Sequence, residues 1–186
     1  KLRRGDSLKI AVIHGSTRLN GNTEYLTYQA IPKEEGTHIF LRDYNIEPIV
    51  DERHSEEGFP EVIDDHEKLI DLMLEHDVLV FSTPIYWYGM SGPLKTYIDR
   101  WSQIMRDPDY THFRGELGKK KAYLIAVGGD HPKVKGLPLV QQFNYICQFY
   151  GMRFEDYVIG EARKPGEIRN DEAALKAAAQ LIKELH

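Results

Sequence analysis

The stretch Leu8-Lys-Ile-Ala-Val-Ile13, which leads into Gly15-Ser-Thr-Arg-Leu-Asn-Gly-Asn-Thr23, decides the fold. Residues 8–13 are an apolar run typical of a buried strand, and residues 24–31 have the apolar spacing of a helix. The loop between them consists mainly of small, hydrogen-bonding residues. The first backbone N–H groups of a helix lack partners, and the helix dipole adds partial positive charge there. The whole stretch therefore predicts an anion site.

The side chains of this loop favour a single phosphate group. Ser16, Asn22 and Thr23 offer hydrogen-bond donors, and Arg18 supplies a positive charge that can bind phosphate through two parallel hydrogen bonds. The spacing matches neither a Walker loop, which needs a lysine after its second glycine, nor the dinucleotide pattern G-x-G-x-x-G. The alternative is an ordinary strand-to-helix connection in which Asn22 or Thr23 caps the helix.

Composition limits the classes of protein to be considered. A length of 186 residues predicts one domain, residues 1–186, and 41% hydrophobic with 28% charged residues is ordinary for a globular protein. The net charge of −5 offers no basic face for nucleic acid. The single cysteine, Cys147, and the lack of metal-ligand spacing among the histidines predict no disulfide and no metal. No apolar run approaches the roughly 20 residues of a membrane span, so we expect a cytoplasmic protein.

Strand-like and helical segments alternate along the chain. Three of the strands are continuous apolar runs, as is typical of strands covered on both faces. The pattern predicts an α/β fold with an open parallel sheet. Residues 42–60 and 106–118 show no period and are expected to be irregular. The predicted strands are 8–13, 37–41, 78–82, 122–127 and 153–159, and the predicted helices are 24–31, 61–74, 91–105, 140–150 and 171–185.

Ligands of such sheets bind beyond the carboxyl ends of the strands. Three loops leave these ends with unusual chemistry, at residues 15–23, 84–92 and 128–131, and they are expected to converge. The second loop places three aromatic residues in a row, which suits a planar heteroaromatic ring. The third has two adjacent glycines that permit close backbone approach to a ring edge. Flavin mononucleotide (FMN) combines a phosphate with such a ring.

At this point the residues resemble a known family. The loop 15–23, the run Thr83-Pro-Ile-Tyr-Trp-Tyr-Gly-Met-Ser-Gly-Pro93 and the Gly-Gly turn after the fourth strand are similar to those of the flavodoxin-like NADPH-dependent FMN reductases. The resemblance extends from Lys9 into the last helix. It implies a flavodoxin-like three-layer sandwich whose five-stranded parallel sheet has the order 2-1-3-4-5. The residues implied to bind FMN are Ser16, Arg18, Asn22, Thr23, Pro84, Ile85, Tyr86, Trp87, Tyr88, Gly89, Gly128 and Gly129.

One departure from related proteins is informative. Iron–sulfur flavoproteins share the aromatic loop but carry a cysteine cluster after the second strand. The corresponding residues here, 46–54, contain no cysteine. The resemblance is therefore to the branch without an iron–sulfur cluster.

The resemblance implies an FMN-dependent NAD(P)H oxidoreductase. NADPH or NADH would deliver hydride to FMN, which would pass it to a quinone, nitro or azo compound or to free flavin, with ping-pong kinetics because both partners use one site. Tyr88 and His131 are candidate proton donors, although an ordinary loop histidine explains His131 equally well. Gly89 is expected to be needed for the tight aromatic turn. The alternative is a flavodoxin-type electron carrier, or an FMN-binding protein without turnover.

The long irregular segments predict two further features. Arg53, Arg106 and Arg114 lie in them and are expected to flank the site, where they suit an anionic dinucleotide. The many aromatic residues of the loops exceed what a monomer normally exposes, so we expect a homodimer or homotetramer. The alternative is that these aromatic residues fold back onto their own domain.

Overall fold

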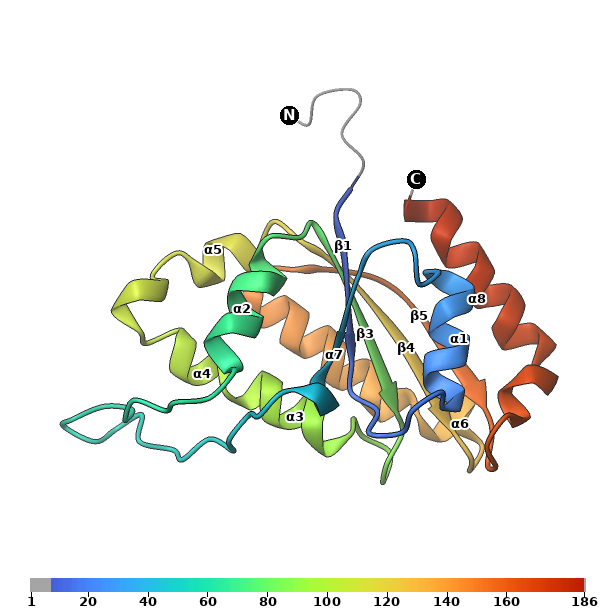
Figure 1. Ribbon diagram of the computed structural model, residues 1–186, viewed down its shortest axis with the longest axis horizontal. Coiled ribbons are helices and arrows are strands. Elements are labelled where there is room, and N and C mark those ends of the chain that lie inside the picture. The colour runs from blue at the N-terminus through green and yellow to red at the C-terminus, as the bar shows by residue number, and fades with distance from the viewer. Residues whose placement is uncertain (1–7, 186) are drawn as a thin grey trace.

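The computed structural model describes residues 8–185, and its centre is a single sheet of five parallel strands (Figure 1). The strand order is β2-β1-β3-β4-β5, which confirms the predicted order 2-1-3-4-5. All the strands run toward one edge of the sheet, the lower edge in Figure 1. The strands are β1 (Ile10–His14), β2 (Thr37–Phe40), β3 (Val78–Pro84), β4 (Lys121–Gly128) and β5 (Arg153–Glu161).

The central strand β3 shows why apolar runs form this sheet. Its residue Val80 pairs with Val12 of β1 and Tyr123 of β4. Successive side chains of a strand point to opposite faces, so Phe81 packs into one core and Val80 into the other. Both faces are covered, and each needs apolar residues.

Helices lie on both faces of the sheet and complete a three-layer sandwich (Figure 1). Helices α1 and α8 pack on one face, whereas α2, α3, α4, α5 and α7 pack on the other. None of the helices between residues 8 and 185 is long and apolar enough to cross a membrane. The helices are α1 (Asn22–Ala30), α2 (His66–Leu74), α3 (Gly92–Asp99), α4 (Trp101–Ile104), α5 (Phe113–Leu117), α6 (Pro132–Lys135), α7 (Leu137–Tyr150) and α8 (Glu172–Leu185), with 3₁₀ turns at Leu41–Asp43, Pro108–Tyr110 and Glu167–Asn170.

The helix predicted from residue 61 begins only at His66. The preceding residues are held by the segment around residue 45 instead: Asn45 N donates to Asp65 Oδ2 at 2.8 Å, and Asp65 N donates to Asn45 O at 2.9 Å. Ile63, which lies within the predicted helix, is 94% exposed. Tertiary hydrogen bonds thus override the local helical period.

Two other segments also differ from expectation. Residues 91–105 form two helices that meet at Arg100, rather than one. Residues 106–118, predicted to be irregular, contain α5 and bury Phe113 completely. A single helix turn that packs one aromatic ring is too short to show a helical period in sequence.

Residues 45–65, called the arm below, extend away from the sheet (Figure 1). The base of the arm is fixed by a buried ion pair between Arg100 Nη1 and Asp64 Oδ2, at 2.6 Å. Arg100 also donates to the carbonyl of Glu47 at 2.9 Å, and Asp64 accepts from Glu47 N at 2.9 Å. One buried charge pair therefore holds both ends of the arm.

Candidate cofactor site

The three predicted loops meet at the carboxyl edge of the sheet and line one cavity of about 360 Å³. The loop after β1, the end of β3 and the turn after β4 each form part of its wall. The loop after β5, which the sequence analysis did not single out, completes it. The residues that line this cavity include Ser16, Arg18, Asn22, Thr23, Pro84, Ile85, Tyr86, Gly128, Gly129, Asp130 and Arg163.

A second cavity of about 290 Å³ adjoins the first and shares Ile85, Gly128, Gly129 and Asp130 with it. Its wall adds Trp87, Tyr88 and Lys135, among others. Every residue that the resemblance implied for FMN, apart from Gly89, lines one of these two cavities. His131 lines neither of them. Taken together, the two adjoining cavities have the size of a small-molecule site.

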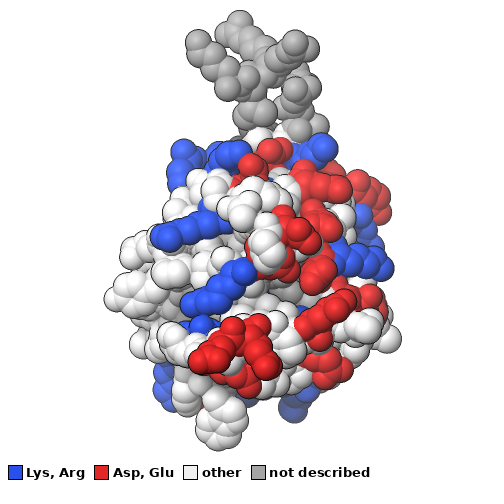
Figure 2. All heavy atoms as spheres, turned by 90° about the vertical axis from the view of Figure 1, so that its left-hand side faces the viewer, with Lys and Arg blue, Asp and Glu red and all other residues white. Residues whose placement is uncertain are grey.

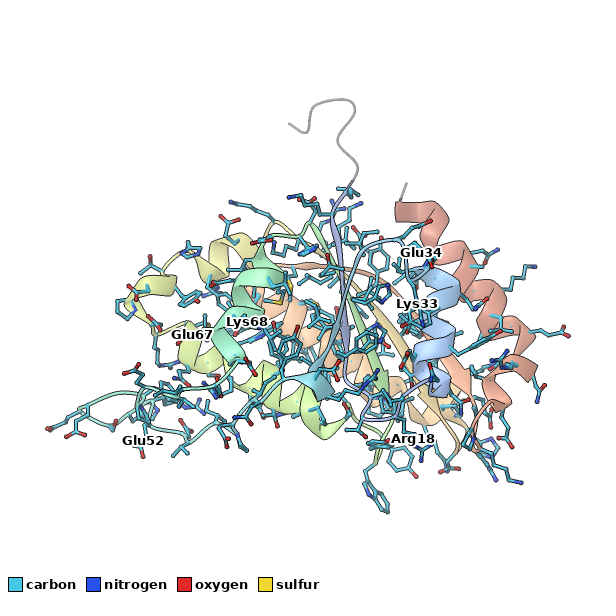
Figure 3. The ribbon with its side chains drawn as sticks, viewed as in Figure 1. Arg18, Lys33, Glu34, Glu52, Glu67 and Lys68 are labelled. Atoms are coloured by element: carbon cyan, nitrogen blue, oxygen red, sulfur yellow. The ribbon has the colours of Figure 1, made fainter. Side chains whose placement is uncertain are left out.

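The first cavity begins at the N-terminus of α1. Ser16 and Thr23 are buried there, with 6% and 4% exposure, and Ser16 Oγ accepts a hydrogen bond from Arg18 N at 3.2 Å. The N-cap residue of α1 is Gly21, which has no side chain to satisfy the first N–H groups. Figure 3 shows Arg18 at this carboxyl edge of the sheet. The chemistry of this end is that of an anion site.

Asn22 joins this end to the loop after β5. Its Nδ2 donates to the carbonyl of Lys164 at 2.9 Å, and its Oδ1 accepts from Gly166 N at 2.8 Å. Both halves of the amide are therefore engaged, and the backbone N–H of Asn22 is what the residue offers at the start of α1. Gly166 has a φ of +84°, which explains the glycine at this contact.

An ion pair beneath the loop shapes it. Arg42 Nη1 lies 3.3 Å from Glu24 Oε2 and donates to the carbonyl of Arg18 at 3.1 Å. The same carboxylate accepts from Asn20 N at 3.2 Å, where the backbone has a φ of +52°. The sequence analysis predicted no role for Glu24 or Arg42. They lie on different elements, α1 and the 3₁₀ turn after β2, so no sequence pattern indicates that they pair. By bonding to the backbone of Asn20 and Arg18, these two side chains hold the loop in shape.

His14, the last residue of β1, adds no positive charge to the site at neutral pH. Burial, followed by the charges of His38 and Arg42, lowers the pKa of His14 from 6.5 to about 3. Its ring stacks on Phe40 with centroids 4.3 Å apart, and its Nε2 lies 2.9 Å from His38 Nδ1. The positive charge of the loop thus comes from Arg18.

The aromatic turn after β3 is closed by two hydrogen bonds between Tyr86 and Gly89, both 3.0 Å long. Trp87 and Tyr88 occupy its two central positions with φ of +48° and +65°, the geometry of a type I′ turn. Gly89 does not lie in the left-handed region, and a Cβ added to it would meet only the Tyr86 carbonyl, at 3.8 Å. The expected need for glycine at position 89 is therefore corrected: Trp87 and Tyr88 carry the unusual backbone conformation.

A chain of side chains links this turn to the turn after β4. Tyr88 donates its phenolic hydrogen to Asp130 Oδ2 at 3.0 Å, and Lys135 Nζ donates to the same oxygen at 2.6 Å. These hydrogen bonds, that of Lys135 first, lower the pKa of the Asp130 carboxyl. Trp87 takes no part and is 94% exposed. The ionised carboxylate fixes Tyr88 at the mouth of the second cavity.

The two adjacent glycines after β4 are required by contacts within the protein. A Cβ on Gly128 would lie 3.0 Å from Pro132 Cβ and 3.2 Å from Ile85 Cβ. A Cβ on Gly129 would lie 2.9 Å from Arg163 Cγ. The sequence analysis expected these glycines to approach a ring edge; the groups that approach them in the structure are the side chains of Pro132, Ile85 and Arg163.

A larger groove of about 950 Å³ opens between α3, α4 and α7. Its wall includes Trp87, Tyr145 and Phe149, all of them exposed, and also Arg53 and Arg106. Arg114, expected beside them, instead places its guanidinium 5.1 Å from the ring centre of Phe149, over the ring, and donates to that residue's carbonyl. Figure 2, which views the end of the molecule at the left of Figure 1, shows acidic groups on the right and at the lower centre, and uncharged surface with several basic groups on the left.

Comparison with known proteins identifies the family to which this architecture belongs. Residues 8–162 match the family model described as NADPH-dependent FMN reductase. YwqN of Bacillus subtilis, whose name assigns it provisionally to the NAD(P)H-dependent FMN-containing oxidoreductases, is 52% identical over 176 residues, which cover 95% of this chain and 97% of YwqN. An iron–sulfur flavoprotein of Methanocaldococcus jannaschii is 28% identical over 191 residues, 96% of this chain and 95% of its own.

A solved structure supports the same assignment. The structure described as the Trp repressor binding protein of Bacillus subtilis aligns with a TM-score of 0.80 and 46% identity, over 94% of this chain and 97% of its own. The family match and the identity to YwqN confirm the resemblance seen in the sequence, and with it FMN and NAD(P)H as the cofactor and electron donor. This chain belongs to the family of NADPH-dependent FMN reductases.

Proposed function

We propose that the two joined cavities bind FMN and that this enzyme passes hydride from NAD(P)H through FMN to a small flat acceptor. The acceptor class consists of quinones, nitro and azo compounds and free flavin. The observation that carries the proposal is the convergence of an anion-binding helix N-terminus, the aromatic turn and the turn after β4 on two adjoining cavities, which share Ile85, Gly128, Gly129 and Asp130. The donors at one end suit a phosphate, and the flat walls at the other suit a ring.

At the phosphate end, the proposed ligands are the hydroxyls of Ser16 and Thr23, the Arg18 guanidinium and the first backbone N–H groups of α1. Asn22 contributes its N–H, because its amide is bonded to the loop after β5. The pair Glu24–Arg42 keeps the loop in shape by bonding to its backbone. The net charge of these groups suits a phosphate dianion.

At the ring end, the residues of this chain act by position. Bound FMN supplies the hydride chemistry itself, and the protein orients it and controls access to it. The type I′ turn presents the backbone of Trp87 and Tyr88, while Ile85 and the glycines at 128 and 129 form the floor. Trp87 also lines the large groove, so its exposed side chain borders both the ring and the place from which a second reactant enters.

Tyr88 is the better placed of the two candidate proton donors. It lines the second cavity and holds its hydroxyl toward Asp130, whereas His131 lines neither cavity. Lys135, bonded to the same carboxylate, keeps Asp130 ionised. We propose that Tyr88 donates the proton to an acceptor that is reduced at this site.

Steady-state kinetics test this proposal. Purified protein loaded with FMN is expected to oxidise NADPH continuously when a quinone is present, with parallel double-reciprocal plots, since donor and acceptor occupy the same place in turn. Tyr88→Phe is expected to slow the acceptor half-reaction and leave the reduction of FMN by NADPH unchanged. Equal slowing of both half-reactions would contradict the proton-donor role.

The same experiment separates the alternative, an electron carrier of flavodoxin type. Such a protein would bind FMN but show no NADPH turnover of its own. The arm bears Asp51, Glu52, Glu56 and Glu57, an acidic concentration that the net charge of −5 does not reveal. Figure 3 shows Glu52 on the arm, far from Arg18, so this acidic region is not at the proposed FMN site.

We also propose that a second copy of this chain covers the large groove, giving a homodimer or a homotetramer. Trp87, Tyr145 and Phe149 expose 94%, 61% and 52% of their surfaces along it. Arg106 in the wall of the groove carries a charge opposite to that of the acidic tip of the arm. The arm of the second copy therefore offers both the reach and the complementary charge to close the groove.

A further inference from the structure

Gly129 makes room for one particular side chain, that of Arg163 in the loop after β5. A Cβ at position 129 would lie 2.9 Å from Arg163 Cγ, closer than these atoms tolerate without a shift, and 3.4 Å from Arg163 Cα. Arg163 Nε donates to the carbonyl of Gly129 at 2.6 Å. Arg163 also lines the first cavity together with Arg18. The arginine is thus seated against the wall of the proposed FMN site.

The loop that carries Arg163 is fixed to the sheet and to the phosphate loop. Ala162 N donates to the carbonyl of Gly128 at 2.8 Å. Glu167 Oε2 accepts from the backbone N–H groups of Arg163 and Lys164, each at 2.8 Å. Asn22 holds the carbonyl of Lys164 from the other side. These bonds fix the backbone from which the exposed Arg163 side chain extends.

The bond to Gly129 uses one of the five N–H donors of the guanidinium. The phosphate end of the cavity has its own cation in Arg18, whereas Arg163 is tied to the turn that meets the ring in the proposed function. A reduced flavin ring carries negative charge along its N1–C2=O edge, and a positive charge beside that edge favours the reduced form. The geometry points to Arg163 as a cofactor-binding residue at the ring edge of FMN, where it favours the reduced state; this rests on the proposed function.

The test compares Arg163→Met with Arg169→Met. Methionine keeps most of the stem that packs on Gly129 but removes the charge. Arg169 is a matched control, because its guanidinium lies over the ring of Tyr25, 4.1 Å from the ring centre, and it does not line either cavity. The dissociation constants of FMN and riboflavin and the two-electron midpoint potential of bound FMN are measured for each protein.

Arg163→Met is expected to weaken the binding of reduced FMN about tenfold more than that of oxidised FMN, as for the loss of one charged hydrogen bond. A tenfold change for a two-electron couple lowers the midpoint potential by about 30 mV. Arg163→Lys, which keeps a charge, is expected to retain part of the wild-type potential, and Arg169→Met all of it. In Arg163→Met, the affinities for oxidised FMN and for oxidised riboflavin are expected to fall by the same factor.

Two results would overturn this inference and leave the proposed function intact. One is an unchanged potential in Arg163→Met while the wild-type protein binds FMN. The other is weaker binding of FMN with unchanged binding of riboflavin, which would place Arg163 on the phosphate. If the wild-type protein does not bind FMN, the proposed function fails and this inference fails with it.

Discussion

Asp64 and Arg100 form an ion pair in which the two side chains are only 1% and 2% exposed, with Oδ2 and Nη1 2.6 Å apart. Asp64 also accepts from the backbone N–H groups of Glu47 and His66. Although burial raises the pKa of the Asp64 carboxyl, these hydrogen bonds and the Arg100 charge outweigh it and hold the pKa below its usual value. The arm is therefore part of the folded core at its base.

Asp64→Ala is expected to lower the free energy of unfolding by about 3–5 kcal/mol, because it leaves the buried Arg100 charge unpaired. Asp51→Ala is the control, since the Asp51–Arg53 pair is exposed and such pairs contribute little. Urea denaturation of both variants measures the difference. A loss below about 1 kcal/mol in Asp64→Ala would show that the pair does not anchor the arm.

Stability is expected to fall as the pH drops below about 6.5, the ordinary pKa of histidine. Burial first of all lowers the pKa of His14 to about 3 and that of His66 to about 4. Between pH 6.5 and these lowered values, the histidines are protonated in the unfolded chain but not in the folded chain. Each histidine therefore lowers the free energy of unfolding by about 1.4 kcal/mol for each pH unit of acidification in this window. Unfolding measured from pH 7 to pH 4 tests this. His14→Gln is expected to flatten the slope, whereas exposed His54→Gln leaves it unchanged.

Arg18→Ala is expected to weaken the binding of FMN by about 1.5–3 kcal/mol, the range for a hydrogen bond to a charged group. Riboflavin, which lacks the phosphate, is expected to bind the variant as it binds the wild type. Lys33→Ala removes the same charge beyond the other end of α1 and serves as the control (Figure 3). Flavin fluorescence titrations give the three affinities, and an equal loss for riboflavin would remove Arg18 from the phosphate.

Substitutions at neighbouring positions of the aromatic turn are expected to affect FMN binding to different extents. Trp87→Phe is expected to retain FMN and to change the relative kcat/KM among quinones, because the backbone stays and only the wall differs. Trp87→Val is expected to weaken FMN binding, since a β-branched residue opposes a φ of +48°. Gly89→Val, where φ is not in that region, is expected to have the smaller effect on affinity. Titration of the three variants with FMN measures these affinities. A larger loss of affinity in Gly89→Val than in Trp87→Val would show that position 87 is not the one at which the backbone conformation limits the choice of residue.

Tyr145→Asp is expected to dissociate the proposed oligomer, because it places a negative charge beside the exposed aromatic side chains of the groove. Tyr157→Asp, on β5 and outside the groove, is expected to leave the assembly intact. Sedimentation velocity at micromolar concentration measures both. A monomeric wild-type protein would show that the groove stays open in solution.

The strands of the sheet could be predicted from the sequence because each is marked by a short run of neighbouring residues. The run from Ile10 to Ile13 and that from Val78 to Phe81 are apolar at every position, as strands covered on both faces require. Parallel strands all end at one edge, so the convergence of the loops after β1, β3 and β4 followed from the order of elements alone. The family resemblance then added the sheet order.

The contacts that complete the site could not be predicted, because they join distant residues. Asn22 and Lys164 are 142 positions apart, and Arg18 and Arg42 are 24 apart. No periodicity links such residues. The left-handed backbone at Trp87 and Tyr88 was missed for another reason: an aromatic pair rarely occupies the centre of a type I′ turn, where Asn and Gly are usual.

The clamp between Asn22 and the backbone at Lys164 and Gly166 has a consequence for the order of events during synthesis. The phosphate loop leaves the ribosome well before the wall that closes its cavity, because Lys164 follows Asn22 by 142 positions. On the proposed function, a nascent chain that has already formed β1, α1 and β3 still lacks part of the cofactor's enclosure. FMN would then be loaded only after the loop that follows β5 has been made, and would not serve as a template for the segments before it.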